Sequence, residues 1–388
     1  MYKKNLVFAA ACLGMLLFGI GLITLGSVAP DLKAKFQLDE ISSGTLFFIL
    51  PLGILTGSLL FGPVCDRFGY KLLLVLSCLF MFIGFEGIAW SPGLGLLKIC
   101  IYVFGVSGGC LNGATNAVVA DISTEAKTAN LSLLGVFFGI GALGTPFVLG
   151  SLKNIFSFSQ VIAVVGLFTF AVGVFYAFIQ FPPSKKAQGF PLLNSTKLFS
   201  DNVLILIAFF LFCQSSFEAI INNWTTSFLT SQLAVDASNA LYALTLYVVG
   251  MTVMRLLTGS VFRFVSPVKM LLASLEILLL GVLFLHFGKT FPLAISGLIL
   301  IGAGLAGGFP IMFGFVGTRY AERSGTAFSF VLVIALIGNM LVNYMMGVIA
   351  HAFGIQYLTT VAFAELGIML ILSVFIFRKI SYERNSEL

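Results

Sequence analysis

Long, nearly continuous apolar runs follow one another along the whole chain, separated by short polar segments. Their length is informative, because an α-helix needs roughly 20 mainly apolar residues to cross the hydrocarbon core of a bilayer. A membrane β-barrel would read instead as short segments of alternating hydrophobicity. The pattern therefore predicts an all-α polytopic membrane protein with twelve transmembrane helices. We expect these spans at residues 6–28, 42–64, 71–90, 96–120, 129–150, 158–181, 203–230, 239–262, 268–287, 292–316, 326–349 and 354–377.

One polar segment is longer than the others and falls near the middle of the chain. Residues 182–200 combine Pro182, Pro183 and Pro191 with lysine and glycine, a composition typical of a linker. The segment predicts two pseudo-symmetric six-helix bundles, at residues 1–181 and 201–388, joined by a cytoplasmic linker at 182–200. The remaining loops are too short to hold a domain outside the membrane.

The composition agrees with this pattern. Hydrophobic residues make up 59% of the chain and charged residues only 9%, whereas a soluble domain carries about 25% charged residues. A water-soluble enzyme, a nucleic-acid-binding protein and a disordered scaffold are therefore excluded. The six cysteines show no paired spacing, so we expect no disulfide framework, no metal site and no cofactor.

The net charge of +6 has a topological explanation. With the N-terminus inside, fifteen basic residues fall in cytoplasmic segments and five on the other side, as the positive-inside rule requires. The bias predicts a multi-pass protein of the cytoplasmic (inner) membrane with both termini in the cytoplasm. The basic charge therefore faces the lipid bilayer surface and needs no nucleic-acid partner.

A charged, glycine-containing turn joins the second and third spans. It contains Gly62, Asp66, Arg67, Gly69 and Lys71. Glycine permits the tight turn, and the basic side chains hold it at the anionic inner leaflet. The acid at the helix end is unusual in this setting, because a carboxylate there can bind a neighbouring helix in one conformation and release it in another.

A similar turn recurs in the second half, with Gly259, Arg263, Phe264 and Lys269. The two turns lie about 197 residues apart, which indicates an internal duplication. The second copy lacks the acid. Glycines at 302, 304, 307 and 308, followed by Pro310, also predict that the tenth span is bendable.

These features resemble the major facilitator superfamily. Residues 62–71 are similar to its signature loop between the second and third helices, and Arg255 lies where many members carry an arginine before the second copy. The resemblance implies a secondary transporter, working as a monomer, whose two halves rock about a central site. It further implies that Asp66, Arg67 and Arg255 are gating residues.

A narrower resemblance is to the fucose/glucose symporter branch. It rests on residues 109–116 in the fourth span and on residues 217–224 in the seventh. It implies a small-molecule solute, a sugar or sugar-like compound, and a coupling ion, a proton rather than sodium. The chain departs from the branch at Asn112, where the symporters carry an acid, and its only acid near the first span, Asp31, is at the outer end.

Polar residues inside the spans are the candidate site, because ionisable groups at bilayer depth are costly and mark functional pathways. Gln214, Glu218 and Asn222 recur every four residues and so share one face of the seventh span, with Trp224 close by. That face cannot meet lipid. Glu218 is the acid that we expect near mid-membrane, where it would bind solute and carry the proton.

Pairs of amides repeat this pattern in two other spans. Asn112 and Asn116 are four residues apart, as are Asn339 and Asn343. Amides offer a donor and an acceptor together, which suits a hydroxyl-rich solute, although buried asparagines can equally join helices. Tyr247 is a further candidate, since an aromatic ring can stack on a sugar.

Other readings stay open. The 42 phenylalanines are also typical of an efflux pump for amphipathic drugs or metabolites. Ser107, within Gly105–Gly108, resembles the serine of intramembrane proteases, but both histidines fall at span ends. We therefore predict a transporter and no enzyme. Glu86, Glu276 and Glu365, in the third, ninth and twelfth spans, are expected to be pairing or interfacial residues.

Overall fold

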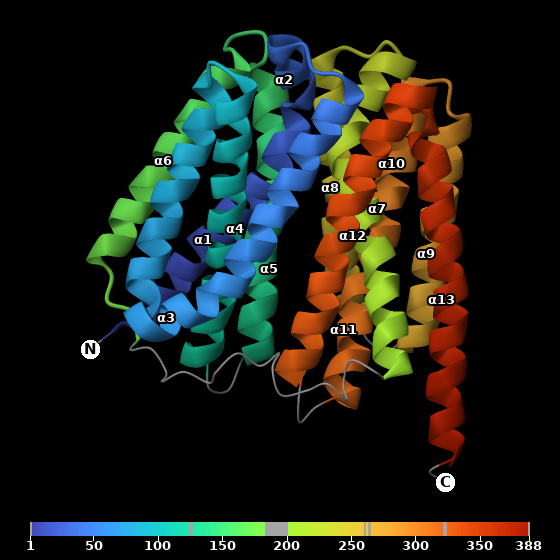
Figure 1. The fold of residues 1–388 in the computed structure, drawn as a ribbon. Coiled ribbons are helices and arrows are strands. Elements are labelled where there is room, and N and C mark those ends of the chain that lie inside the picture. Colours follow the sequence, from blue (N-terminus) through green and yellow to red (C-terminus); the bar gives the residue numbers. More distant parts are fainter. Residues whose placement is uncertain are drawn as a thin grey trace. The chain divides into compact units, whose positions relative to one another are not determined.

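The computed structural model describes residues 2–123, 127–182, 201–259, 261–262, 265–320 and 324–386 (Figure 1). In these residues every regular element is a helix. The helices are α1 (Lys4–Ser27), α2 (Ala29–Phe36), α3 (Glu40–Trp90), α4 (Leu94–Ile122), α5 (Lys127–Leu152), α6 (Phe158–Phe178), α7 (Asn202–Gln232), α8 (Ala237–Gly259), α9 (Pro267–Phe287), α10 (Phe291–Leu305), α11 (Gly308–Arg319), α12 (Ser324–Phe353), the 3₁₀-helix η4 (Ile355–Tyr357) and α13 (Leu358–Ser386).

Within the described residues, twelve helical segments are long and apolar enough to cross a membrane. This confirms the predicted all-α polytopic fold and its number of spans. Two details differ from the prediction. The second and third spans both belong to α3, which bends where Gly69 adopts the left-handed value φ 81°. The tenth span is divided between α10 and α11, so the bendable stretch of glycines is a break in the helix.

The chain divides into two compact units. One contains Met1–Gly189 with Ala237–Tyr242, and the other contains Phe190–Asp236 with Ala243–Leu388. The predicted linker falls almost entirely outside the described residues, so its bounds stay a prediction. In the first unit α3 packs against α4 and α6, and α1 packs against α4 and α5. In the second unit α7 packs against α12 and α13, and α9 packs against α10 and α13.

The same close helix approaches recur in both units at one constant offset. A Cβ added at Gly105 would collide with the carbonyl oxygen of Leu50, and one added at Gly302 would collide with that of Tyr247. Both members of the second contact lie 197 residues after those of the first. The same offset relates two further contacts: Gly53 with Tyr102 and Gly250 with Ile299, and Gly84 with Phe104 and Gly281 with Ile301. The duplication inferred from the two turns therefore extends to the helix packing.

Replacing Gly302 by alanine is expected to destabilise the second unit, because the new methyl group would meet backbone that cannot move aside. Overpacking of this kind costs about 1–3 kcal/mol. The control is Gly367→Ala in α13, where an added Cβ meets no atom within 4 Å. Thermal unfolding in detergent should show a lower midpoint for Gly302→Ala alone. Equal midpoints would show that the glycine contact is dispensable.

Candidate functional site

Glu218 lies on α7 and faces α8. Its carboxyl interacts electrostatically with the guanidinium of Arg255 and with the phenol of Tyr247, and both partners belong to α8. Among the described residues no hydrogen bond or ion pair joins the three groups. The Tyr247 hydroxyl and the Arg255 Nε are both buried, and neither has a hydrogen-bond partner in the part of the chain that the structure describes. Arg255, predicted as a gating residue, thus faces the predicted proton carrier.

Asn222 lies one helical turn beyond Glu218 on the same face of α7. It is 5% exposed, and its Oδ1 has no hydrogen-bond partner. A buried polar atom without a partner costs about 1–3 kcal/mol, so such atoms are rare and need an explanation. Tyr247 is fully buried as well. Asn222 on α7 and Tyr247 on α8 therefore each present a buried polar atom that no described protein group bonds.

A chain of amides runs beside this stripe from α7 to α12. Asn223 Nδ2 donates to Asn343 Oδ1 at 3.1 Å. Asn343 Nδ2 donates in turn to the Asn339 carbonyl oxygen at 2.8 Å and to its Oδ1 at 3.3 Å. Asn343 is completely buried, whereas Asn339 is partly exposed. The side-chain amide of Asn343 is therefore hydrogen-bonded within the protein through both its oxygen and its nitrogen. Asn343 thereby holds Asn339 in place.

Gln214 has a specific partner at the break in the tenth span. Its Nε2 donates to the carbonyl oxygen of Leu305, the last residue of α10, at 2.8 Å. The final carbonyl groups of a helix lack partners within the helix, and the Gln214 amide satisfies one of them. Trp224 is also buried on α7.

The two candidate amides of the first unit are neighbours on α4. Asn116 Nδ2 donates to the Asn112 carbonyl oxygen at 2.9 Å and to its Oδ1 at 3.0 Å. Both side chains are partly exposed. Ser107, on the same helix, donates to the Val103 carbonyl oxygen at 2.7 Å. The histidines, at positions 286 and 351, both belong to the second unit.

The predicted gate is described only in part. The side chain of Asp66 lies outside the described residues, and Arg67 is exposed, with its guanidinium 5.3 Å from the centre of the Phe68 ring. Next to this turn, Tyr70 donates to Asp121 Oδ2 at 2.8 Å. That bond ties the start of the third span to the end of the fourth. This bond could not be predicted from the sequence, because nothing along the chain relates the two residues.

A second cluster joins α7 to the end of α11. Asp201 caps α7 by accepting from the backbone N–H groups of Val203 and Leu204 at 2.8 and 3.2 Å, and it lies 3.5 Å from Arg319. Burial opposes its ionisation, but the Tyr320 hydroxyl, the two backbone donors and the Arg319 charge together lower the pKa of Asp201. Burial, followed by the bond to Asp201, raises the pKa of Tyr320. This cluster holds the two helices together at that end of the unit.

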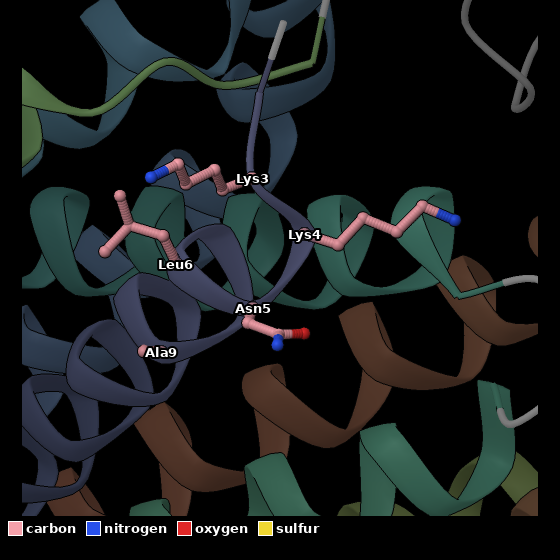
Figure 2. A pocket seen from close by; sticks show the side chains of 5 residues that line it. All are labelled: Lys3, Lys4, Asn5, Leu6 and Ala9. Atoms are coloured by element: carbon pink, nitrogen blue, oxygen red, sulfur yellow. The ribbon is translucent and has the colours of Figure 1, made fainter.

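A surface hollow of about 570 Å³ lies at the start of α1. Lys3, Lys4, Asn5, Leu6 and Ala9 line it, and Figure 2 shows the two lysine side chains extending away from each other. The lining side chains are exposed and include no acid. The hollow is therefore not the place where the buried polar side chains gather.

Comparisons with known proteins agree on a family. A family model described as the Major Facilitator Superfamily matches residues 11–241. The chain is 24% identical over 344 residues to the glucose/mannose transporter GlcP of Bacillus subtilis, covering 85% of this chain and 84% of that protein. It is 22% identical over 341 residues to an uncharacterized transporter, y4wD, of Sinorhizobium fredii, covering 87% and 90%.

Solved structures share the fold. The crystal structure of a mutant of the nucleoside transporter NupG superposes with a TM-score of 0.81 at 16% identity, over 97% of this chain and 99% of that one. A bacterial homologue of the human lysosomal transporter Spinster, in an inward-facing and occupied conformation, gives a TM-score of 0.74 at 14% identity, over 96% of each chain.

Proposed function

The chain belongs to the Major Facilitator Superfamily, and on that premise we propose that this multi-pass transporter takes up a small, neutral, hydroxyl-rich solute together with a proton. The solute is a sugar or a compound that contains one, and the membrane is the cytoplasmic (inner) membrane. Glu218 carries the proton. The solute and the proton cross the membrane together by alternating access about a central site.

The observation that carries this proposal is the set of unpaired polar atoms around Glu218. Asn222 Oδ1 and the Tyr247 hydroxyl are buried without partners among the described residues, and Asn343 holds Asn339 in the same unit. Neutral donors and acceptors match hydroxyl groups, each of which both donates and accepts. The relatives support this class, because GlcP is named a glucose/mannose transporter and NupG a nucleoside transporter, and a nucleoside contains a sugar.

The coupling role rests on Glu218 and Arg255. Inserting an ionised carboxylate at bilayer depth costs about 2.5–3.5 kcal/mol of free energy by insertion scales. An acid at that depth therefore indicates a functional role. Arg255 interacts with it electrostatically but makes no ion-pair contact. Binding a proton at Glu218 would weaken this attraction, which gives the proton a route to alter how α7 and α8 interact.

A ligand screen tests the solute class. The purified protein would be heated with sugars, nucleosides, amino acids and amphipathic drugs, since a ligand at about 100 times its Kd stabilises the folded state by about 2.7 kcal/mol. We expect a sugar or nucleoside to raise the unfolding temperature, and Asn222→Leu to lose that shift. Gln232→Leu, an exposed amide on the same helix, is the control. Stabilisation by amphipathic drugs alone would favour the efflux pump.

A further inference from the structure

Glu365 is a buried acid on the side of α7 that the proposed site does not use. It lies on α13, is 6% exposed, and its Oε1 is hydrogen-bonded to the hydroxyl of Ser216 on α7. Ser216 and Glu218 are two residues apart, so they point about 200° from each other around the helix. The acid therefore contacts the back of the helix whose front carries Glu218.

The hydrogen bonds of Ser216 constrain where protons lie. Besides Glu365, its Oγ is 2.8 Å from the Phe212 carbonyl oxygen and 3.1 Å from that of Cys213. A hydroxyl has one hydrogen and cannot donate to three acceptors. If Glu365 is a neutral acid, it donates to Ser216 Oγ and the Ser216 hydrogen is free to bond Phe212. When Glu365 is ionised, its carboxylate and the Phe212 carbonyl oxygen compete for the single Ser216 hydrogen. When Glu365 is protonated, both hydrogen bonds can form.

The electrostatic surroundings of Glu365 also favour its neutral, protonated form. The described neighbours that act on Glu365 are the Ser216 hydroxyl and the Cys213 thiol, and neither is a cation. From α9, the His286 ring contacts the Phe363 ring and is bonded to Thr359. No hydrogen bond or ion pair joins His286 to Glu365 in the described part of the chain, and Glu276 is exposed. Glu365 Oε2 is buried and has no partner among the residues that the structure describes. An isolated carboxylate in such a place is very costly.

We propose that Glu365 is a second proton-binding site of this transporter, in which the bound proton links α13 to α7 through Ser216. Loss of the proton removes the donor to Ser216 and places an uncompensated charge between the two helices. The α7–α13 contact therefore loosens at alkaline pH. The effect of this site on turnover rests on the proposed transport function. The site itself does not depend on Glu218 being the proton carrier.

Infrared spectroscopy of the purified protein tests the proton directly. A protonated carboxyl group absorbs apart from the amide bands, so subtracting the spectrum of Glu365→Gln from that of the wild type isolates this group. We expect its band at neutral pH, a shift of the band in Ser216→Ala, and its loss at alkaline pH. A band absent at every pH, or unchanged over the whole range in which the protein is folded, overturns the proposal. If Glu365→Gln does not fold, Ser216→Ala against the wild type gives the same decision.

Counterflow exchange tests the effect on transport. In the Glu218→Gln background no proton can titrate at position 218, yet exchange should still fall at alkaline pH, by about tenfold for each pH unit above the midpoint. Adding Glu365→Gln should remove that fall, because the glutamine amide donates at every pH. Adding Glu276→Gln instead should leave it. No fall in the Glu218→Gln background overturns the proposed effect of Glu365 on turnover, whereas absence of any exchange, with the infrared band present, refutes only the transport proposal.

Discussion

Replacing Glu218 by glutamine is expected to abolish proton-driven uptake into proteoliposomes while leaving counterflow exchange of the solute intact. Glutamine has nearly the same size and can still form hydrogen bonds, but it cannot bind or release a proton. Counterflow needs only the loaded carrier to reorient in both directions, without net proton movement, so it should survive. The measurement is uptake of labelled solute with and without an imposed pH gradient.

The matched control is Glu276→Gln, which neutralises an exposed acid of the same unit. It should retain both activities. Loss of counterflow together with uptake in Glu218→Gln would show that the carboxyl group is required for solute binding or folding, and would contradict the separate coupling role. Unchanged uptake with an unchanged dependence on the pH gradient would remove Glu218 from the coupling mechanism.

Replacing Asn343 by leucine is expected to raise the KM for the solute by roughly tenfold to a hundredfold, with less effect on maximal rate. Asn343 is fully buried, accepts from Asn223 and donates to Asn339. Its loss leaves the Asn223 amide unpaired and Asn339 free to turn, and an unsatisfied buried group costs about 1–3 kcal/mol. Initial uptake rates over a range of solute concentrations measure the effect.

A double-mutant cycle with Asn223→Leu distinguishes this positioning role from direct contact. If Asn343 acts through the amide chain, the Asn223→Leu and Asn343→Leu effects on KM should be less than additive. Additive effects would show that the two asparagines act independently. Unchanged KM in Asn343→Leu, with normal stability, would contradict a role for the amide chain in solute binding.

The spans and the duplication could be predicted because both leave signals along the chain. A membrane helix needs roughly 20 apolar residues, which even a single sequence displays. The offset of about 197 residues between the turns also relates the contact of Gly105 with Leu50 to that of Gly302 with Tyr247. The glycines of the tenth span likewise marked its break, which lies between Leu305 and Gly308.

The partners of the polar residues could not be predicted, because helical periodicity orders residues on one helix only. It placed Glu218 and Asn222 on one face, but it could not show that Asn223 meets Asn343 or that Ser216 meets Glu365. Gln214, for example, shares the predicted stripe and yet bonds the end of α10. Such pairs depend on how helices distant in sequence pack, which a single sequence does not record.

The most direct test of the central claim is proton movement driven by the solute itself. Proteoliposomes would enclose a pH-sensitive dye, and the solute identified by the ligand screen would be added outside without any ion gradient. We expect acidification of the lumen, which Glu218→Gln should abolish and Glu276→Gln should retain. Solute entry without any pH change in the wild type would contradict proton-coupled uptake.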